Sequence, residues 1–348
     1  MSNIFSRSPY IITIDEAGQV QTTLKLYLWR GYGTAPTEPQ YTFTKVIPSS
    51  NKPATYYDIS PYINEYFDLL LTEDITSPSL SDVTMWLNVK VERIADTVNL
   101  GSTTYKAFYG YTEFTNGYNY DNGSLLIDQS TFYFYSDATN KGCFYYLTPT
   151  IGVEGTLIVV YTDLVTGSQY TYELTDSNKL YMIPSVHYSN GNKIEIIHIV
   201  GETSTTLKTL YFKPKDECKY TPVKCDFINK YGGWQRIWFY KASNETFNVE
   251  SNEYNLLPFY YPNYSTSMAQ RQSFNSNAKE TIKVNTDWVD EDYKEVIKQL
   301  MLSEKIRIDD KPAIIKTKSL ELFKSINTKM INYQLEFDIA TNYINNVF

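Results

Sequence analysis

Histidine and cysteine, the residues that most often bind metals or act as nucleophiles, are scarce in this chain of 348 residues. The two histidines are His187 and His198, and the three cysteines are Cys143, Cys218 and Cys225. Cys218 and Cys225 lack the paired CxxC spacing of zinc sites, and His198 lies in an apolar run that indicates a strand. The motifs GxxxxGK(S/T), GxGxxG and GxSxG are also missing from the sequence. We therefore expect no catalytic residue, no cofactor and no metal site.

Carboxylates are the other candidates for chemistry. Asp287, Asp290, Glu291 and Asp292 form an acidic cluster, and two carboxylates suffice for a glycoside hydrolase. The same residues precede an apolar helical pattern, and the dipole at a helix N-terminus favours negative charge. We favour this structural interpretation and keep a hydrolase of cell-wall glycan as a third hypothesis for function.

Aromatic residues make up 16% of the chain, and the 33 tyrosines outnumber the 17 phenylalanines. Tyrosine suits a pleated, half-buried surface and keeps a polar end for water or a partner. The aromatic clusters at 234–240 and 259–261 could stack on sugars, or they could anchor a core or a protein interface. The residues that we predict to form an interface are Trp234, Trp238, Leu256, Leu257, Phe259, Tyr260 and Tyr261.

Charge and composition narrow the range of partners. A formal net charge of −8 without any run of five like charges argues against nucleic acid as a direct partner of the surface as a whole. Three cysteines are too few for a disulfide framework, which favours reduced thiols in a bacterial cytoplasm. The apolar run at 10–14 is shorter than a signal-peptide core, and no stretch is long enough to span a membrane. We expect a soluble protein without a cleavable signal.

The length and the strand patterns predict a mainly β protein of two or three domains. Residues 1–120 are expected to form a β-sandwich domain. Its first strand, at 10–14, and a second strand that bears Leu24, Leu26 and Leu28 on one face are predicted to pair as a hairpin.

The same domain is predicted to contain a strand at 83–94, where apolar and polar residues alternate, and one short helix. Ser60 is the expected N-cap of this helix, and Pro61 is its expected first residue. The apolar face of the helix is predicted to consist of Tyr62, Ile63, Tyr66, Phe67 and Leu70.

Residues 125–212 are predicted to form a second domain, an immunoglobulin-like β-sandwich, because short apolar runs alternate with turns rich in Gly, Asn, Asp and Pro. The polar stretch 213–217 is expected to be a linker. The predicted strands are 132–135, 143–147, 156–161, 169–174, 180–183, 193–200 and 207–212.

Residues 213–348 are predicted to form a small α+β C-terminal domain. It begins with a hairpin of strands 223–228 and 234–240, whose loop contains two glycines that are free to take positive φ. A helix is expected to follow, capped by Thr286 or Asp287. Its predicted apolar face consists of Val296, Ile297, Leu300 and Met301.

Three further features are predicted in this domain. A second hairpin is expected at 305–308 and 314–317, followed by a last strand at 331–339. Residues 241–280 show little periodicity and are expected to be a long irregular insertion. Such a segment is often functional or ordered only by a partner, so we place an assembly contact there.

Short motifs in the sequence resemble those of one family. Residues 224–234, which read KCDFINKYGGW, resemble a Phe-Ile-Asn-Lys/Arg-Tyr/Phe-Gly motif of virion proteins from phages that infect Bacteroidetes. The helix and strands of 288–337 are similar to the same proteins, as are SPYIITI and YYDISPYINEYF in the first domain. The chain thus resembles the tail-barrel ring proteins of crAss-like podoviruses of gut Bacteroides.

The resemblance implies a non-enzymatic structural protein of the virion tail. It implies a closed homo-oligomeric ring around the DNA channel, in contact with other tail, neck or portal proteins and at most in non-specific proximity to DNA, with assembly in the host cytoplasm. No membrane partner is expected. The alternative is a receptor-binding or carbohydrate-binding tail protein, because sandwiches rich in Tyr and Trp can present aromatic platforms to glycans. We find no internal repeat of the kind that elongated fibres use.

Overall fold

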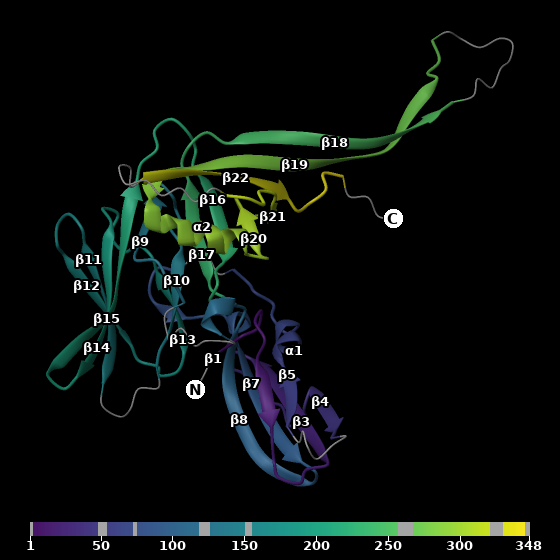
Figure 1. The fold of residues 1–348 in the computed structure, drawn as a ribbon. Coiled ribbons are helices and arrows are strands. Elements are labelled where there is room, and N and C mark those ends of the chain that lie inside the picture. The colour runs from purple at the N-terminus through teal and green to yellow at the C-terminus, as the bar shows by residue number, and fades with distance from the viewer. Residues whose placement is uncertain are drawn as a thin grey trace. The chain divides into compact units, whose positions relative to one another are not determined.

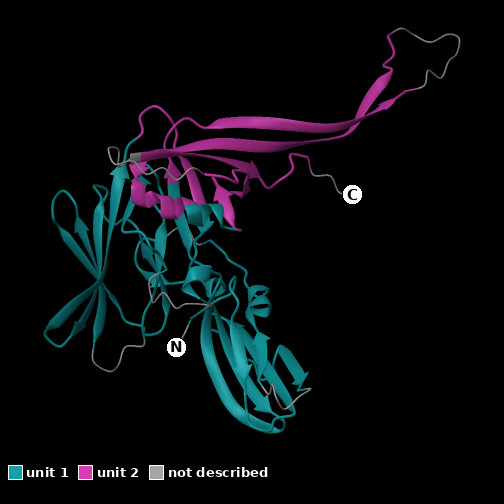
Figure 2. Ribbon diagram, viewed as in Figure 1, with its two compact units in different colours: residues 1–216, 227–237, 298–303 teal, residues 217–226, 238–297, 304–348 magenta. Residues whose placement is uncertain are grey.

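A computed structural model describes residues 3–47, 54–71, 75–117, 126–149, 155–256, 267–320 and 330–344. The protein is mainly β, with 54% of residues in strands and 7% in helices, and it contains several sheets (Figure 1). Two compact units can be distinguished (Figure 2). Unit 1 comprises residues 1–216, 227–237 and 298–303, and unit 2 comprises residues 217–226, 238–297 and 304–348.

The N-terminal part of unit 1 contains a five-stranded sheet in the order β1-β8-β7-β3-β4. Only its β1–β8 pair is parallel. A separate two-stranded sheet pairs β2 with β5. These strands are β1 (Asn3–Phe5), β2 (Ile11–Ile14), β3 (Gln21–Arg30), β4 (Tyr41–Val46), β5 (Thr55–Asp58), β7 (Leu87–Ala95) and β8 (Val98–Phe108).

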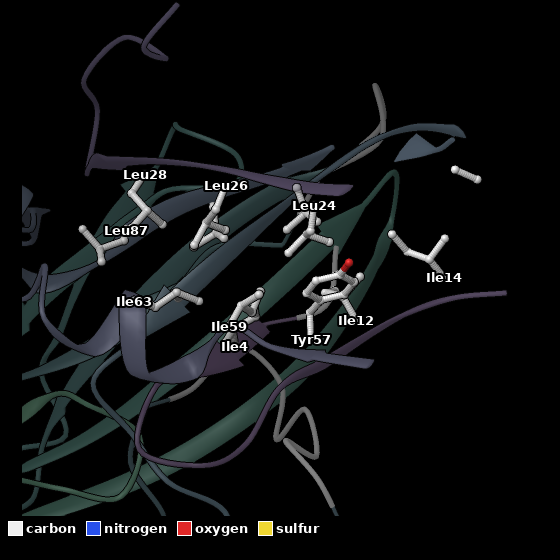
Figure 3. Packing of buried hydrophobic residues seen from close by; sticks show 14 residues of the cluster. Ile4, Ile12, Ile14, Leu24, Leu26, Leu28, Tyr57, Ile59, Ile63 and Leu87 are labelled. Carbon is white, nitrogen blue, oxygen red and sulfur yellow. The ribbon is translucent and has the colours of Figure 1, made fainter. Parts of the chain in front are cut away.

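The predicted hairpin between the first two long strands was wrong. β2 pairs with β5, whereas β3 pairs with β4 on one edge and with β7 on the other. Because both edges of β3 are occupied, β2 has no edge of that strand to join. The predicted face is nevertheless confirmed: Leu24, Leu26 and Leu28 are buried in one cluster with Ile12 and Ile14 of β2 (Figure 3).

The strand predicted at 83–94 begins later than expected. Residues Val83–Met85 form a 3₁₀ turn, η1, and only Leu87–Ala95 form the strand. Leu87, Val89 and Val91 are buried, which confirms the alternation within β7.

The short helix α1 (Ser60–Asn64) exists, but its predicted cap was wrong. Ile59 occupies the N-cap, and the hydroxyl of Ser60 donates to Oδ1 of Asp58 at 2.7 Å instead of capping a backbone N–H. Ile63 is buried beneath β3 residues (Figure 3), whereas Leu70 lies beyond the helix end and is 52% exposed. The helix is therefore too short to present all of the predicted face.

All seven strands predicted between residues 132 and 212 are confirmed. Together with β6 they form two sheets of unit 1, one in the order β12-β11-β14-β15-β9 and one in the order β10-β13-β6. Phe144 of β10 stacks on Phe212 of β15, with ring centroids 6.0 Å apart. The bounds are β6 (Ser79–Leu80), β9 (Thr131–Tyr135), β10 (Cys143–Leu147), β11 (Thr156–Asp163), β12 (Gln169–Leu174), β13 (Leu180–Pro184), β14 (Asn192–Val200) and β15 (Thr203–Lys215).

The linker predicted at 213–217 is in part a strand. Residues 213–215 complete β15 and pair in parallel with residues 133–135 of β9. Pro214 is tolerated there because the pairing of β14 with β15 ends at Phe212, so no residue of β14 requires an N–H from Pro214.

A seven-stranded sheet in the order β17-β16-β20-β21-β22-β19-β18 organises the C-terminal part of the chain. The division between the two units falls within β16, β17 and the helix α2. The elements are β16 (Val223–Ile228), β17 (Trp234–Phe239), β18 (Asn244–Asn255), β19 (Arg271–Asp290), η3 (Glu291–Tyr293), α2 (Lys294–Met301), β20 (Ile306–Ile308), β21 (Lys311–Ile315) and β22 (Met330–Ile339).

The helix in this part begins later than predicted. β19 continues to Asp290, so Thr286 and Asp287 are strand residues and cap nothing. The hydroxyl of Thr286 accepts the backbone N–H of Tyr333 at 2.9 Å, at the register shift between β19 and β22. Tertiary pairing with β22 thus extends the strand through the predicted caps. The apolar face of α2 is confirmed, since Val296, Ile297 and Leu300 are buried.

The hairpin predicted near residue 310 is confirmed with a shorter turn. Asp309 and Asp310 have φ values of 44° and 68°, as a two-residue type I′ turn requires. Pro312, expected in the loop, lies in β21 opposite Arg307. The last strand is confirmed as β22, with Tyr333, Leu335, Phe337 and Ile339 buried on one face.

Candidate assembly surface

The segment 241–280, predicted to be irregular, is largely a β-hairpin. β18 and residues 271–283 of β19 pair antiparallel, from Asn244 opposite Lys283 to Asn255 opposite Arg271. Residues 257–266 lie outside the described residues. Figure 1 shows the two strands running on together beyond β22. The sequence signal that could have revealed this hairpin is the alternation Glu-Thr-Phe-Asn-Val at 245–249.

All twelve residues of β18 are exposed to solvent. β22 pairs with β19 from Thr281 to Asp290, and the described residues after β22 form hydrogen bonds with β19 at Asn277 and Ala278. Beyond Asn277, the described residues supply β19 with no neighbour other than β18. The distal part of the β18–β19 hairpin therefore consists of two strands.

Large apolar side chains lie exposed on this hairpin. Phe247 and Val249, two residues apart on one face of β18, are 52% and 61% exposed. Tyr343 packs edge-on against Phe247, with ring centroids 5.0 Å apart, and is itself 68% exposed. Farther along, Tyr254 and Phe274 form a second ring pair at 5.5 Å. Contiguous exposed apolar groups are typical of surfaces that bind another protein.

Charge is distributed unevenly between the two strands. β18 carries Glu245, Glu250 and Glu253 and no basic residue, whereas residues 271–283 of β19 carry Arg271, Lys279 and Lys283 with one acidic residue. The pairs Arg271–Glu253 and Lys279–Glu250 lie at 3.8 and 3.6 Å, and their side chains are largely exposed. Pairs of this kind contribute little to stability, so these charges remain available to a partner.

The loop between β16 and β17, which carries the family-like motif, is buried. The Asn229 amide accepts the backbone N–H of Tyr231 at 3.0 Å and that of Gly233 at 3.2 Å, and it donates to the carbonyl of Leu126 at 2.9 Å. The Tyr231 hydroxyl donates to Asp128 at 2.6 Å. Burial, with a contribution from Asp128, raises the pKa of Tyr231 far above its usual range.

Two glycines let the backbone pass close to this loop. A Cβ at Gly110 would lie 2.5 Å from the Lys230 carbonyl, and one at Gly232 would lie 2.6 Å from the Tyr109 nitrogen. Gly232 also has a φ of 86°, which disfavours other residues. The motif residues of this loop thus have a structural role: they fasten the loop to the core of unit 1.

The predicted interface residues fall into three groups. Trp234 and Trp238 are only 6% and 8% exposed, so both rings are buried within the single chain. Leu256 is half-buried next to the end of β18, and its N–H donates to the carbonyl of Gln270 at 2.8 Å. The others, Leu257, Phe259, Tyr260 and Tyr261, lie outside the described residues. The role of these residues in an interface stays a prediction.

The residues considered for catalysis or metal binding are dispersed. Asp287 forms an ion pair with Lys241 at 3.5 Å, and Glu291 pairs with Lys294 at 3.3 Å. Within the described ranges, no three His, Cys, Asp or Glu side chains are grouped as a metal would require. His187 stacks on Tyr170 with ring centroids 4.1 Å apart, and burial lowers its pKa. None of the three cysteines forms a disulfide.

Comparison with known proteins gives no relative: no protein-family model matches the chain, and no curated protein matches its sequence. In the part of the chain that the structure describes, no helix has the length and apolar character needed to cross a bilayer.

Proposed function

We propose that this protein is a non-enzymatic structural component of a phage virion, which forms a ring of the tail barrel or neck around the DNA channel. Its finer architecture, in this proposal, is two β-sandwich domains, the second of them immunoglobulin-like, followed by a small α+β domain. The ring contacts further copies of the chain and neighbouring tail, neck or portal proteins. The proposal extends the sequence resemblance with one structural observation, the exposed β18–β19 hairpin.

The exposed hairpin supports an assembly function, because a two-stranded hairpin that stays in water without a partner is energetically unfavourable. A two-stranded hairpin is marginally stable by itself, and a long exposed edge strand is a template for pairing with another chain. β18 exposes twelve consecutive residues, including the apolar Phe247 and Val249. A neighbouring subunit that covers this hairpin would bury the apolar side chains and supply partners to the backbone groups of the edge.

A closed ring is the assembly that a single repeated contact can generate. When one surface of a copy binds a different surface of the next copy, the series closes if the rotation between them divides a full turn. A hairpin that extends from its own sheet suits such a head-to-tail contact, because it presents a surface that the rest of the subunit does not use.

The proposal is tested by incorporation into particles. The double variant Phe247→Asp with Val249→Asp places charges on the exposed apolar face, and we expect a folded protein that is lost from virions by at least tenfold. Val20→Asp with Val165→Asp is the matched control, since these valines are 63% and 75% exposed on unit 1. The control should be incorporated like the native chain. Normal incorporation of the hairpin variant would contradict the proposal.

A further inference from the structure

The backbone register shows which groups of the distal hairpin face outward. The N–H of Leu256 donates to the carbonyl of Gln270 at 2.8 Å, so these two residues form a hydrogen-bonded pair. Hydrogen-bonded and non-hydrogen-bonded pairs alternate along an antiparallel ladder. The pairs Asn255 with Arg271 and Glu253 with Ser273 are consequently non-hydrogen-bonded.

In such pairs the N–H and C=O groups point away from the partner strand. Glu253 and Asn255 therefore direct their backbone groups to the outer edge of β18, and Arg271 and Ser273 direct theirs to the outer edge of β19. Among the described residues, neither edge has a strand beside it at these positions. The distal hairpin thus carries two open edges, one on each strand.

The two open edges differ in charge. The β18 edge is acidic, with Glu245, Glu250 and Glu253, whereas the charged residue in the distal part of β19, residues 271–276, is Arg271. Two β18 edges placed together would bring like charges opposite each other, which destabilises a sheet. A β18 edge beside a β19 edge would instead bring opposite charges together.

We propose that the hairpins of successive copies of this chain pair edge to edge, with β18 of one copy beside the distal part of β19 of the next. Since β18 and β19 run antiparallel within each hairpin, similarly directed hairpins make an antiparallel junction of the same kind at every step. The occupant of each edge is a second copy of the chain, and the product is a continuous intermolecular sheet. This inference rests on the proposed homo-oligomeric function and specifies its contact.

The test uses proline, which removes a backbone donor and is tolerated on edge strands. Glu253→Pro should block the β18 edge, and Ser273→Pro should block the β19 edge, while both outward N–H groups lie outside the bonds of the hairpin itself. Glu253→Ala and Ser273→Ala are the matched controls, because they remove the same side chains and keep the donor. Each full-length protein is measured by sedimentation across a range of concentrations, with circular dichroism to verify folding.

We expect the native chain and both alanine variants to form species larger than a dimer of the 40.3 kDa monomer. Each proline variant alone should remain monomeric. An equimolar mixture of the two should form a dimer and nothing larger, because only one β18 edge and one β19 edge remain to pair.

Three results would overturn the inference. Dimers of Ser273→Pro alone would show that two β18 edges pair with each other. Proline variants that assemble like the native chain, or a native chain that stays monomeric at every concentration, would show that the hairpins do not pair. Loss of incorporation by the Phe247→Asp and Val249→Asp variant would still support the virion function in each case, so the two proposals fail separately.

Discussion

Two hairpins of this protein differ in how their backbone hydrogen-bonding groups are satisfied. In the β16–β17 hairpin the loop is buried, and the Asn229 side chain satisfies backbone groups of the loop from within the chain. In the β18–β19 hairpin every residue of β18 is exposed, and no described strand lies beside the distal edges. The first hairpin is completed by its own chain, and the second is the one that we propose to be covered by another copy. The comparison predicts that substitutions around the buried β16–β17 loop lower the stability of the fold, whereas substitutions on the exposed β18–β19 hairpin change it little.

The largest effect on stability is expected at α2, which supports the buried loop. Gln299 of this helix accepts the N–H of Lys230 at 3.3 Å, and Leu300 beside it is fully buried. Leu300→Ala should lower the free energy of unfolding by about 2–5 kcal/mol, as other large-to-small core changes do. Lys294→Ala, on the partly exposed side of the helix, should change it by roughly 0.5 kcal/mol or less. Equal shifts in urea denaturation would show that the buried face is misassigned.

A smaller loss is expected at the loop itself. Asn229→Ala leaves buried N–H and C=O groups without partners, and each such group costs roughly 1–3 kcal/mol. Asn252→Ala is the matched change on the exposed hairpin and should stay within about 0.5 kcal/mol. Thermal and urea unfolding of the two variants measures the difference. A neutral Asn229→Ala would contradict the view that the loop depends on this amide.

Buried and exposed lysines should also differ in how they affect the pH dependence of folding stability. Lys106 is buried in β8 over the ring of Trp86, and desolvation, with Lys179 nearby, lowers its pKa to about 8. At this group the unfolded chain therefore binds more protons than the folded one between pH 8 and the ordinary lysine range, so the contribution of Lys106 to the free energy of unfolding should rise with pH in that window. Lys106→Met should abolish this rise, whereas Lys279→Met on the hairpin should keep it. An unchanged slope in Lys106→Met would refute the assignment.

The smallest effect is expected for the ion pair between Glu250 and Lys279. Both side chains are more than half exposed, and pairs of this kind contribute about 0.2–1 kcal/mol. A double-mutant cycle with Glu250→Ala and Lys279→Ala should give a coupling energy at the low end of that range. A coupling above about 1 kcal/mol in the isolated chain would mean that the hairpin is more rigid by itself than the comparison assumes.

The sequence predicted well what depends on local pattern. All seven strands predicted between 132 and 212 were found, because turn residues separate short apolar runs there. The apolar face of α2 was found for the same reason, since Val296, Ile297 and Leu300 have helical spacing. A local sequence pattern is sufficient to predict a helix or a strand when one face of that element is buried within its own domain.

Pairing between distant segments was not predictable in this way. β2 pairs with β5 rather than with its neighbour in sequence, because the partners of β3 come from residues 41–46 and 87–95. The exposed hairpin was missed because the apolar alternation in β18 is short: Phe247 and Val249 are followed by four polar residues, 250–253.

The acidic residues of β18 have a consequence for the chain before it assembles. A free edge with Phe247 and Val249 beside it is an aggregation hazard, because identical strands can stack without limit. Glu245, Glu250 and Glu253 interrupt that edge at intervals and act as gatekeepers against such stacking. In the proposed edge-to-edge pairing, these carboxylates also keep unassembled copies from stacking on one another until the β19 edge of the next copy pairs with them.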